Sequence, residues 1–302
     1  MKKILFATDL SEICEAPFHA AIDIAKKGNR WLYVVHILES AHLGRHRSFV
    51  KDIWTDEEHS ATSEYVEKVK GLIRDMYVPK MNGFANYSIE VRPGFPYTEI
   101  LRTASREHID LIIMAPHTGM AEIKGVSRTC GRVGSTLEGV TTGAHCPVMV
   151  VPRPPKRTDS FERILVATDF SKCGNYAFGF ALGMAKKSDA RLFILTVSER
   201  MPTVFGVRDH AGSSEEIATE RYGSKLTGFE DYVIEGAEGV AHMEILKFAR
   251  AQDADLIVMG AHARQEDPAW CPDDTVDTVA EVSMRSPCPV IAVCAREALH
   301  RI

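Results

Sequence analysis

The chain has 302 residues, of which 45% are hydrophobic and 25% are charged, and its formal net charge is −5. This length exceeds one core of about 100–200 residues, so it predicts two domains, and the acidic balance disfavours a nucleic-acid-binding protein. The apolar run near the N-terminus covers only residues 4–7, too short for a signal peptide, and no run reaches the roughly 18 residues of a membrane helix, so we expect a cytoplasmic protein without a membrane partner.

The first half of the chain alternates between short apolar runs and segments with helical spacing. Strands are predicted at Ile4–Thr8, Trp31–Leu38, Tyr87–Pro93, Leu111–Ala115 and Val148–Val151. Helices are predicted at Glu12–Gly28, from about Asp56 to Lys80, at Tyr97–His108 and at Val133–Thr141. Apolar strands separated by helices indicate an α/β fold with a parallel sheet covered on both faces, and right-handed crossovers make it doubly wound.

The same pattern occurs twice in the chain. The stretch "ILFATDLS" from Ile4 returns as "ILVATDFS" from Ile164, with six of eight letters identical at an offset of 160 residues. Two further stretches repeat at smaller offsets: Thr98–His117 returns as Met243–His262, and His145–Val151 returns as Pro287–Val293. The copies therefore differ in loop length. A proline-rich segment separates them, which predicts a first domain at 1–152, a linker at 153–160 and a second domain at 161–302.

Polar residues cluster where the predicted strands end. In a doubly wound sheet, ligands bind outside the carboxyl ends of the strands. The residues at or just after these ends are Asp9, Ser11, His36 and His117 in the first copy, and Asp169, Ser171 and His262 in the second. An Asp or Ser between a strand and a helix is also an ordinary turn or N-cap residue, which requires no ligand.

The histidines have two interpretations as well. His36 and His117 are expected at neighbouring strand ends, which would suit a site. Alternatively His117, like its counterpart His262, closes the fourth strand by hydrogen bonding to a nearby loop.

The repeated motifs resemble the universal stress protein family over nearly the whole chain, twice. They are the opening strand with Asp-x-Ser, the Met-x-x-His at Met114 and Met259, and the Cys-Pro-Val at Cys146 and Cys288. The resemblance implies two tandem five-stranded domains with strand order 3-2-1-4-5, arranged as a pseudo-dimer. Single-domain members commonly dimerise through the last strand. Whether this chain also forms a homodimer stays open.

Many members of this family bind ATP, and the resemblance implies a site in the first copy. The family pattern is G-x2-G-x9-G-(S/T) after the fourth strand, with glycines and a hydroxyl at the phosphates. Asp9 matches the residue that contacts the nucleoside, and Ile37 matches the position that meets adenine through its backbone. The candidate residues are Ala7, Thr8, Asp9, Ser11, Ile37, Met114, Ala115, His117, Thr118, Gly134, Ser135 and Thr136.

The first copy departs from the family pattern between the fourth strand and the following helix. Ala115 and Thr118 stand in place of the first two glycines, and 15 residues separate Thr118 from Gly134 where the pattern has nine. This segment contains the basic residues Lys124, Arg128 and Arg132. Two interpretations stay open: the segment folds around phosphate in its own way, or it is a surface loop.

The second copy matches the pattern at Asp169, Val197 and Gly260, while Ala263 replaces the second glycine. Asp277-Thr278 replaces the final Gly-Ser, and the loop before it carries four more acids, Glu266, Asp267, Asp273 and Asp274. Clustered carboxylates repel a triphosphate unless a cation bridges them, so the first copy is the expected site. A metal site in this loop is one interpretation, and a solvated acidic loop is the other.

The remaining reactive residue types give weaker hypotheses. Seven scattered cysteines without CxxC indicate thiols and not a disulfide framework. Cys146 and Cys288 are expected to pack in the core, whereas Cys14 and Cys173 lie near helix starts, where a thiol pKa can fall. His42 and His46 have zinc-compatible spacing, although an exposed basic loop explains them too.

The leading functional hypothesis is a stress-response protein that binds ATP or a related adenine nucleotide, with or without Mg, and regulates protein partners. One alternative is a scaffold of the same fold without nucleotide or other cofactor. A second alternative is a weak ATPase, although the sequence contains no P-loop, G-x-S-x-G or H-E-x-x-H motif.

Overall fold

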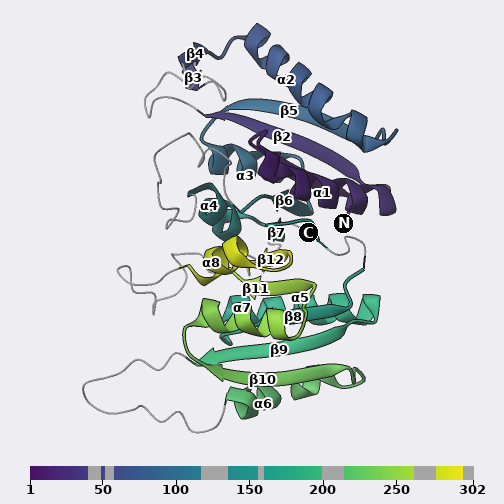
Figure 1. The fold of residues 1–302 in the computed structure, drawn as a ribbon, viewed down its shortest axis with the longest axis vertical. Helices are drawn as coiled ribbons and strands as arrows, with labels where there is room; N and C mark the ends of the chain where they lie inside the picture. Colours follow the sequence, from purple (N-terminus) through teal and green to yellow (C-terminus); the bar gives the residue numbers. More distant parts are fainter. Residues whose placement is uncertain are drawn as a thin grey trace, which may run out of the picture. The chain divides into compact units, whose positions relative to one another are not determined.

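The computed structural model describes residues 1–39, 49–51, 58–116, 135–155, 160–198, 214–261 and 277–294. The chain divides into two compact units, Met1–Pro154 (unit 1) and Pro155–Ile302 (unit 2) (Figure 1). The division falls inside the segment 153–160 that the sequence predicts as a linker.

Unit 1 contains a five-stranded parallel sheet with helices between the strands. Its strands are β1 (Lys3–Thr8), β2 (Trp31–Glu39), β5 (Tyr87–Gly94), β6 (Leu111–Met114) and β7 (Val148–Val150). Its helices are α1 (Glu15–Lys27), α2 (Ser63–Tyr77), α3 (Pro96–Arg106) and α4 (Ser135–Gly143), with two 3₁₀ turns, η1 (Glu12–Cys14) and η2 (Pro79–Met81). The sheet order is β5-β2-β1-β6-β7, and each neighbouring pair is parallel.

Unit 2 repeats this arrangement. Its strands are β8 (Arg163–Ala167), β9 (Arg191–Ser198), β10 (Tyr232–Glu238), β11 (Leu256–Gly260) and β12 (Val290–Val293). Its helices are α5 (Lys172–Ser188), α6 (Ser214–Leu226), α7 (Ala241–Ala251) and α8 (Thr278–Arg285). The order β10-β9-β8-β11-β12 matches unit 1 strand for strand, in the sequence 3-2-1-4-5 that the resemblance implies. The predicted doubly wound α/β fold in two repeats is confirmed, while the pseudo-dimer stays a prediction.

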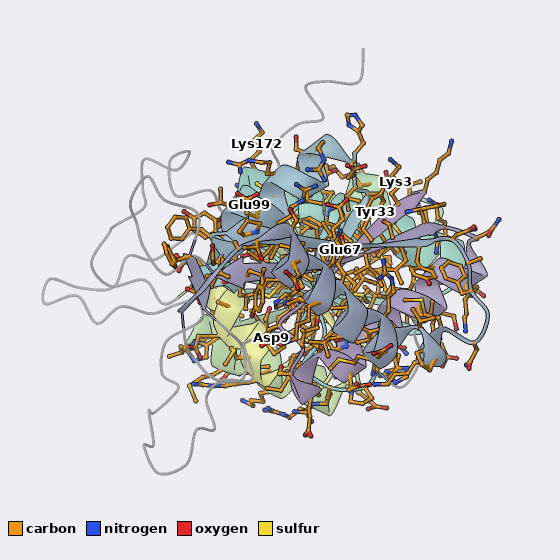
Figure 2. The ribbon with its side chains drawn as sticks, turned by 90° about the horizontal axis from the view of Figure 1, so that it is seen from above. Lys3, Asp9, Tyr33, Glu67, Glu99 and Lys172 are labelled. Carbon is orange, nitrogen blue, oxygen red and sulfur yellow. The ribbon has the colours of Figure 1, made fainter. Side chains whose placement is uncertain are left out.

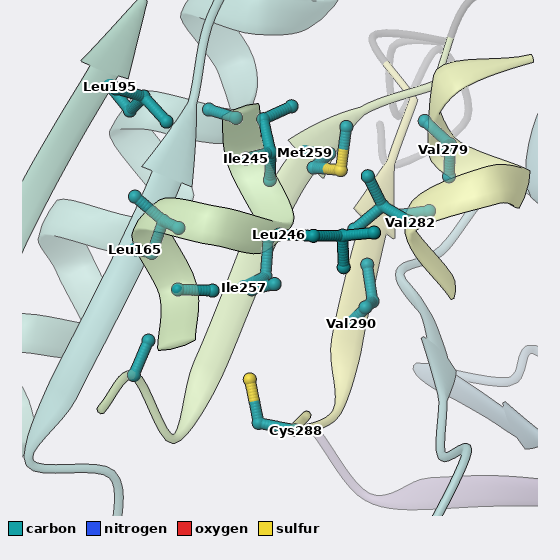
Figure 3. Close-up of a cluster of buried hydrophobic side chains, with 14 of the residues drawn as sticks. Leu165, Leu195, Ile245, Leu246, Ile257, Met259, Val279, Val282, Cys288 and Val290 are labelled. Carbon is teal, nitrogen blue, oxygen red and sulfur yellow. The ribbon is translucent and has the colours of Figure 1, made fainter. Parts of the chain in front are cut away.

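Side chains on both faces of each sheet are buried, which explains the nearly continuous apolar strands. In unit 2, Leu165 of β8, Leu195 of β9 and Ile257 of β11 pack with Leu246 of α7 and Val282 of α8 (Figure 3). The intervening residues, such as Ile164 and Val166, are also fully buried, and α5 contacts the same strands. Because successive strand residues face opposite sides, burial of both sets requires helices on both faces.

Two predicted helix starts are wrong. The helix expected from about Asp56 begins at Ser63, because Thr62 is extended and its hydroxyl caps the backbone N–H of Tyr65. Before it, β4 (Glu58–Ser60) pairs antiparallel with β3 (Phe49–Lys51). The helix expected from Glu12 opens with the 3₁₀ turn η1, and α1 starts only at Glu15. Among the described helices, none is long and apolar enough to cross a membrane.

Candidate functional site

The Asp-x-Ser motif forms a tight turn at the end of the first strand in both units. In unit 1, Leu10 has a φ of 66°, and the backbone N–H of Ser11 donates to Asp9 Oδ1 at 3.0 Å. In unit 2, Phe170 has a φ of 61°, and Ser171 N–H donates to Asp169 Oδ1, also at 3.0 Å. Each Asp therefore stabilises a left-handed residue between strand and helix, and its predicted role in a turn is confirmed.

A pair of buried hydroxyl groups lies next to each turn. Thr8, the last residue of β1, places its Oγ1 2.7 Å from Tyr77 Oη and accepts from Leu10 N–H at 2.9 Å. In unit 2, Thr168 Oγ1 lies 2.9 Å from Tyr222 Oη. Neither tyrosine was predicted from the sequence. Their offset of 145 residues equals that of the stretches from Thr98 and Met243, so aligning the copies through the second helix would have found them.

His36 is a buried histidine beside this turn in unit 1. It pairs in register with Thr8, and its Nδ1–H donates to the Thr8 carbonyl oxygen at 2.8 Å. Its Nε2 has no hydrogen-bond partner among the described residues, and burial lowers the pKa of the imidazole below 6.5. The side chain is therefore neutral at physiological pH. Unit 2 has Thr196 at this position.

The expected proximity of His36 and His117 is not supported by the strand order. Because β1 lies between β2 and β6, the end of β2 is not adjacent to the end of β6. His117 itself lies outside the described residues, as does His262.

Asp9 also accepts hydrogen bonds from two side chains. Its Oδ1 accepts from the Ser11 hydroxyl and from the Cys14 thiol, the latter at 3.0 Å (Asp9 is labelled in Figure 2). Burial, followed by the charge of Asp9, raises the pKa of Cys14 to about 12. The hypothesis of a reactive thiol at Cys14 is therefore wrong, because desolvation and a neighbouring carboxylate outweigh any effect of the helix start.

The structure brings together the candidate residues on three adjacent strands of unit 1. Residues 7–9 and 11 lie at or after the end of β1, Ile37 lies next to His36 on β2, and Met114 and Ala115 lie at the end of β6. Parallel pairing places these three carboxyl ends at one edge of the sheet. At the equivalent edge of unit 2, Asp169 follows β8, Val197 lies on β9 and Gly260 ends β11.

Several candidates cannot be placed at this edge. His117, Thr118 and Gly134 lie outside the described residues, as do His42, His46 and the loops 119–133 and 264–276. Ser135 begins α4, and Thr136 follows it. Within the described ranges, no group of three His, Cys, Asp or Glu side chains could hold a metal ion. None of the five described cysteines forms a disulfide, and Cys146 and Cys288 are buried as predicted.

Comparisons with known proteins agree with the repeat and the fold. The family model described as "Universal stress protein family" matches residues 1–152 and again residues 160–293. The universal stress protein MJ0531 of Methanocaldococcus jannaschii is 29% identical over 156 residues, which cover 51% of this chain and 84% of that protein. The universal stress protein SH1215 of Staphylococcus haemolyticus is 30% identical over 172 residues, covering 57% of this chain and 96% of that protein.

The solved structures that match both units include a universal stress protein. A universal stress protein from Archaeoglobus fulgidus matches with a TM-score of 0.66 and 20% identity, and the match covers 97% of this chain and 96% of that chain. This structural similarity supports the fold, whereas the family assignment rests on the match between the sequence and the family model. With matches to both of its repeats, the chain belongs to the universal stress protein family.

Proposed function

We propose that this protein binds ATP or a related adenine nucleotide at the edge formed by β1, β2 and β6 of unit 1. The observation that carries the proposal is that Asp9, Ile37 and Ala115 lie at or near the carboxyl ends of three adjacent strands, at one edge of the sheet. In the family pattern, the position of Asp9 holds the carboxylate that contacts the nucleoside, and the position of Ile37 meets adenine through its backbone. The position of Ala115 begins the segment that binds phosphate. The carboxylate suits the ribose hydroxyls, which are hydrogen-bond donors.

Charge in the sequence favours unit 1 over unit 2. The segment 119–133 has Lys124, Arg128 and Arg132 against one acid, Glu122. The segment 264–276 has four acids against one Arg, at Arg264. Basic residues and glycines suit phosphate oxygens, whereas a run of carboxylates repels them. In this proposal unit 2 has a structural or regulatory role, and magnesium would accompany the triphosphate.

The bound nucleotide would set the interactions of the protein with its partners during stress, in the cytoplasm. A nucleotide-free scaffold is the second candidate, and a specific observation favours it. Oδ1 of Asp9 already accepts three hydrogen bonds, and Ala115 and Thr118 replace the glycines of the family pattern. Under this alternative the site has lost its ligand and the surface of the fold recruits partners.

Titration calorimetry with ATP, with and without magnesium, tests the proposal on the full chain. Asp9→Ala and Ser135→Ala should each weaken binding about tenfold or more, since a hydrogen bond to a charged group contributes about 1.5–3 kcal/mol. Asp169→Ala is the matched control in unit 2 and should leave the affinity unchanged. An unchanged affinity in Asp9→Ala would place the site elsewhere, and absence of binding at millimolar ATP would favour the scaffold. Phosphate release that Asp9→Ala abolishes would indicate a slow ATPase.

A further inference from the structure

The two units differ at one position beside the Asp-x-Ser turn. When Asp9 is aligned with Asp169, Cys14 aligns with Gly174. A Cβ at Gly174 would lie 2.4 Å from Asp169 Oδ1 and 2.9 Å from Thr168 Oγ1, so a side chain there would force the Asp169 carboxylate to move. Unit 1 therefore has a thiol next to its Asp where unit 2 has only a hydrogen atom.

A second difference lies at the end of the fourth strand, where unit 2 again has the smaller residue. Unit 2 has Gly260, and unit 1 has Ala115 at the aligned position. A Cβ on Gly260 would lie 2.5 Å from the carbonyl carbon of Cys173 and 2.7 Å from the nitrogen of Gly174. These are backbone atoms, which cannot move aside as a side-chain end can. A unit with alanine at this position therefore needs a different path for the start of its first helix.

Unit 1 follows such a different path. In unit 2, α5 begins directly after Ser171, whose Oγ accepts from the backbone N–H of Gly174 at 3.0 Å. In unit 1, the 3₁₀ turn η1 comes first, closed by the bond from Cys14 N–H to the Ser11 carbonyl oxygen at 3.1 Å. The side chain of Ser11 makes no capping bond to this turn, and α1 begins at Glu15.

This different path changes the hydrogen bonds and the exposure of Asp9. Its Oδ1 accepts from Ser11 N–H, from the Ser11 hydroxyl and from the Cys14 thiol, and the residue is half-buried, whereas Asp169 is exposed. A carboxylate oxygen offers about two lone-pair sites, so three donors saturate it. An acceptor in this state binds a further hydroxyl less strongly.

We propose that Cys14, together with Ala115, is a positioning residue that holds the Asp9 carboxylate against the helix start and weakens its Oδ1 as an acceptor for the ribose hydroxyls of a nucleoside. This inference rests on the proposed function, and it adds that the residue opposite Asp9 tunes the contact with ribose. In unit 2, which has glycine at both positions, Asp169 is exposed, whereas in unit 1 Asp9 is half-buried and accepts a hydrogen bond from the Cys14 thiol.

The test compares the binding of adenosine and 2′,3′-dideoxyadenosine, which differ only in the ribose hydroxyls. All variants carry Asp169→Ala, so that unit 2 does not contribute through its own carboxylate. Cys14→Ala removes the donor and should raise the preference for adenosine about threefold to tenfold, the effect of one hydrogen bond. Cys14→Ser, the matched control, keeps a donor and should leave the preference unchanged. Cys14→Gly with Ala115→Gly should raise the preference at least as much as Cys14→Ala.

A second measurement follows the thiol without a nucleoside. The infrared S–H band of Cys14, identified as the band lost in Cys14→Ser, should shift to higher frequency in Asp9→Asn, because a neutral amide oxygen is a weaker acceptor. Equal preferences in Cys14→Ala and Cys14→Ser, or an S–H band unmoved by Asp9→Asn, would overturn this inference while leaving adenosine binding intact. If no variant binds adenosine, the proposed function fails and the inference fails with it.

Discussion

The hydroxyl groups of Thr8 and Tyr77 lie 2.7 Å apart in the buried interior of unit 1, and they join the end of β1 to the end of α2. Tyr77 is fully buried, and its ring contacts those of Phe6 and Phe18. The same relationship recurs between Thr168 and Tyr222. The turn that carries each Asp is therefore tied to a helix about 50 to 70 residues further along the chain.

Tyr77→Phe tests the contribution of this hydrogen bond. The ring keeps its packing, but the Thr8 hydroxyl loses its buried partner, so the free energy of unfolding should fall by about 1–2 kcal/mol. Urea denaturation measures the change. In unit 2, Tyr222 Oη also donates to Asn175 Oδ1 at 2.9 Å, so Tyr222→Phe removes two contacts and should cost at least as much. A loss below about 0.3 kcal/mol in both variants would show that the tie is energetically unimportant.

His36 should make the stability of the protein depend on pH. Burial lowers its pKa in the folded state below the 6.5 of the unfolded chain. As the pH falls below about 6.5, the unfolded state binds a proton that the folded state does not bind, so stability falls by up to about 1.4 kcal/mol per pH unit. The loss continues until the pH reaches the folded-state pKa.

The comparison with His36→Gln isolates this effect from the other histidines. Glutamine does not titrate, so the wild-type protein should lose stability relative to the variant between about pH 7.5 and pH 5.5. Urea denaturation of both proteins at several pH values measures the difference. A wild-type protein that gains stability relative to the variant on acidification would mean that His36 is charged in the folded state.

Much of the fold could be predicted from the sequence, because it depends on patterns that are local or repeated. The apolar strand from Ile4 and its copy from Ile164 indicated a sheet covered on both faces, and buried residues on both faces explain why. The start of α2 could not be predicted from charge and length alone. The capping bond of Thr62 decides it, and a threonine in a polar stretch carries little signal by itself.

For the candidate site, the positions of the residues in the sheet could be predicted, but their contacts could not. Asp9, Ile37 and Ala115 lie at or near the strand ends where they were expected, in the strand order that the family resemblance implies. The bond from Cys14 to Asp9 was not predictable, because it depends on a 3₁₀ turn in place of an α-helical start. Tyr77 was missed because its partner, Thr8, lies 69 residues away in sequence.

The thiol of Cys14 should be unreactive in the folded protein. Burial and the charge of Asp9 raise its pKa to about 12, and burial raises the pKa of Cys146 to about 12 as well. Iodoacetamide at about pH 8 reacts with thiolates, so mass spectrometry of the native protein should find both cysteines unmodified. The half-buried Cys294 is the internal reference and should react faster. Equal labelling of Cys14 and Cys294 would contradict the burial of Cys14.

Gly260→Ala tests the close approach between β11 and the start of α5. The added Cβ would lie 2.5 Å from the carbonyl carbon of Cys173, so either the strand end or the helix start must move. The free energy of unfolding should fall by about 1–3 kcal/mol, as in other overpacked sites.

Gly179→Ala within α5 is the matched control, because nothing lies within 4 Å of its Cβ position. Alanine has the higher helix propensity, so this control should stabilise the protein by about 0.5–1 kcal/mol. Thermal unfolding of the full chain compares the two variants. If Gly260→Ala is as harmless as Gly179→Ala, the strand end has room for a Cβ, and glycine at this position would be explained better by approach to a ligand than by contact with the helix.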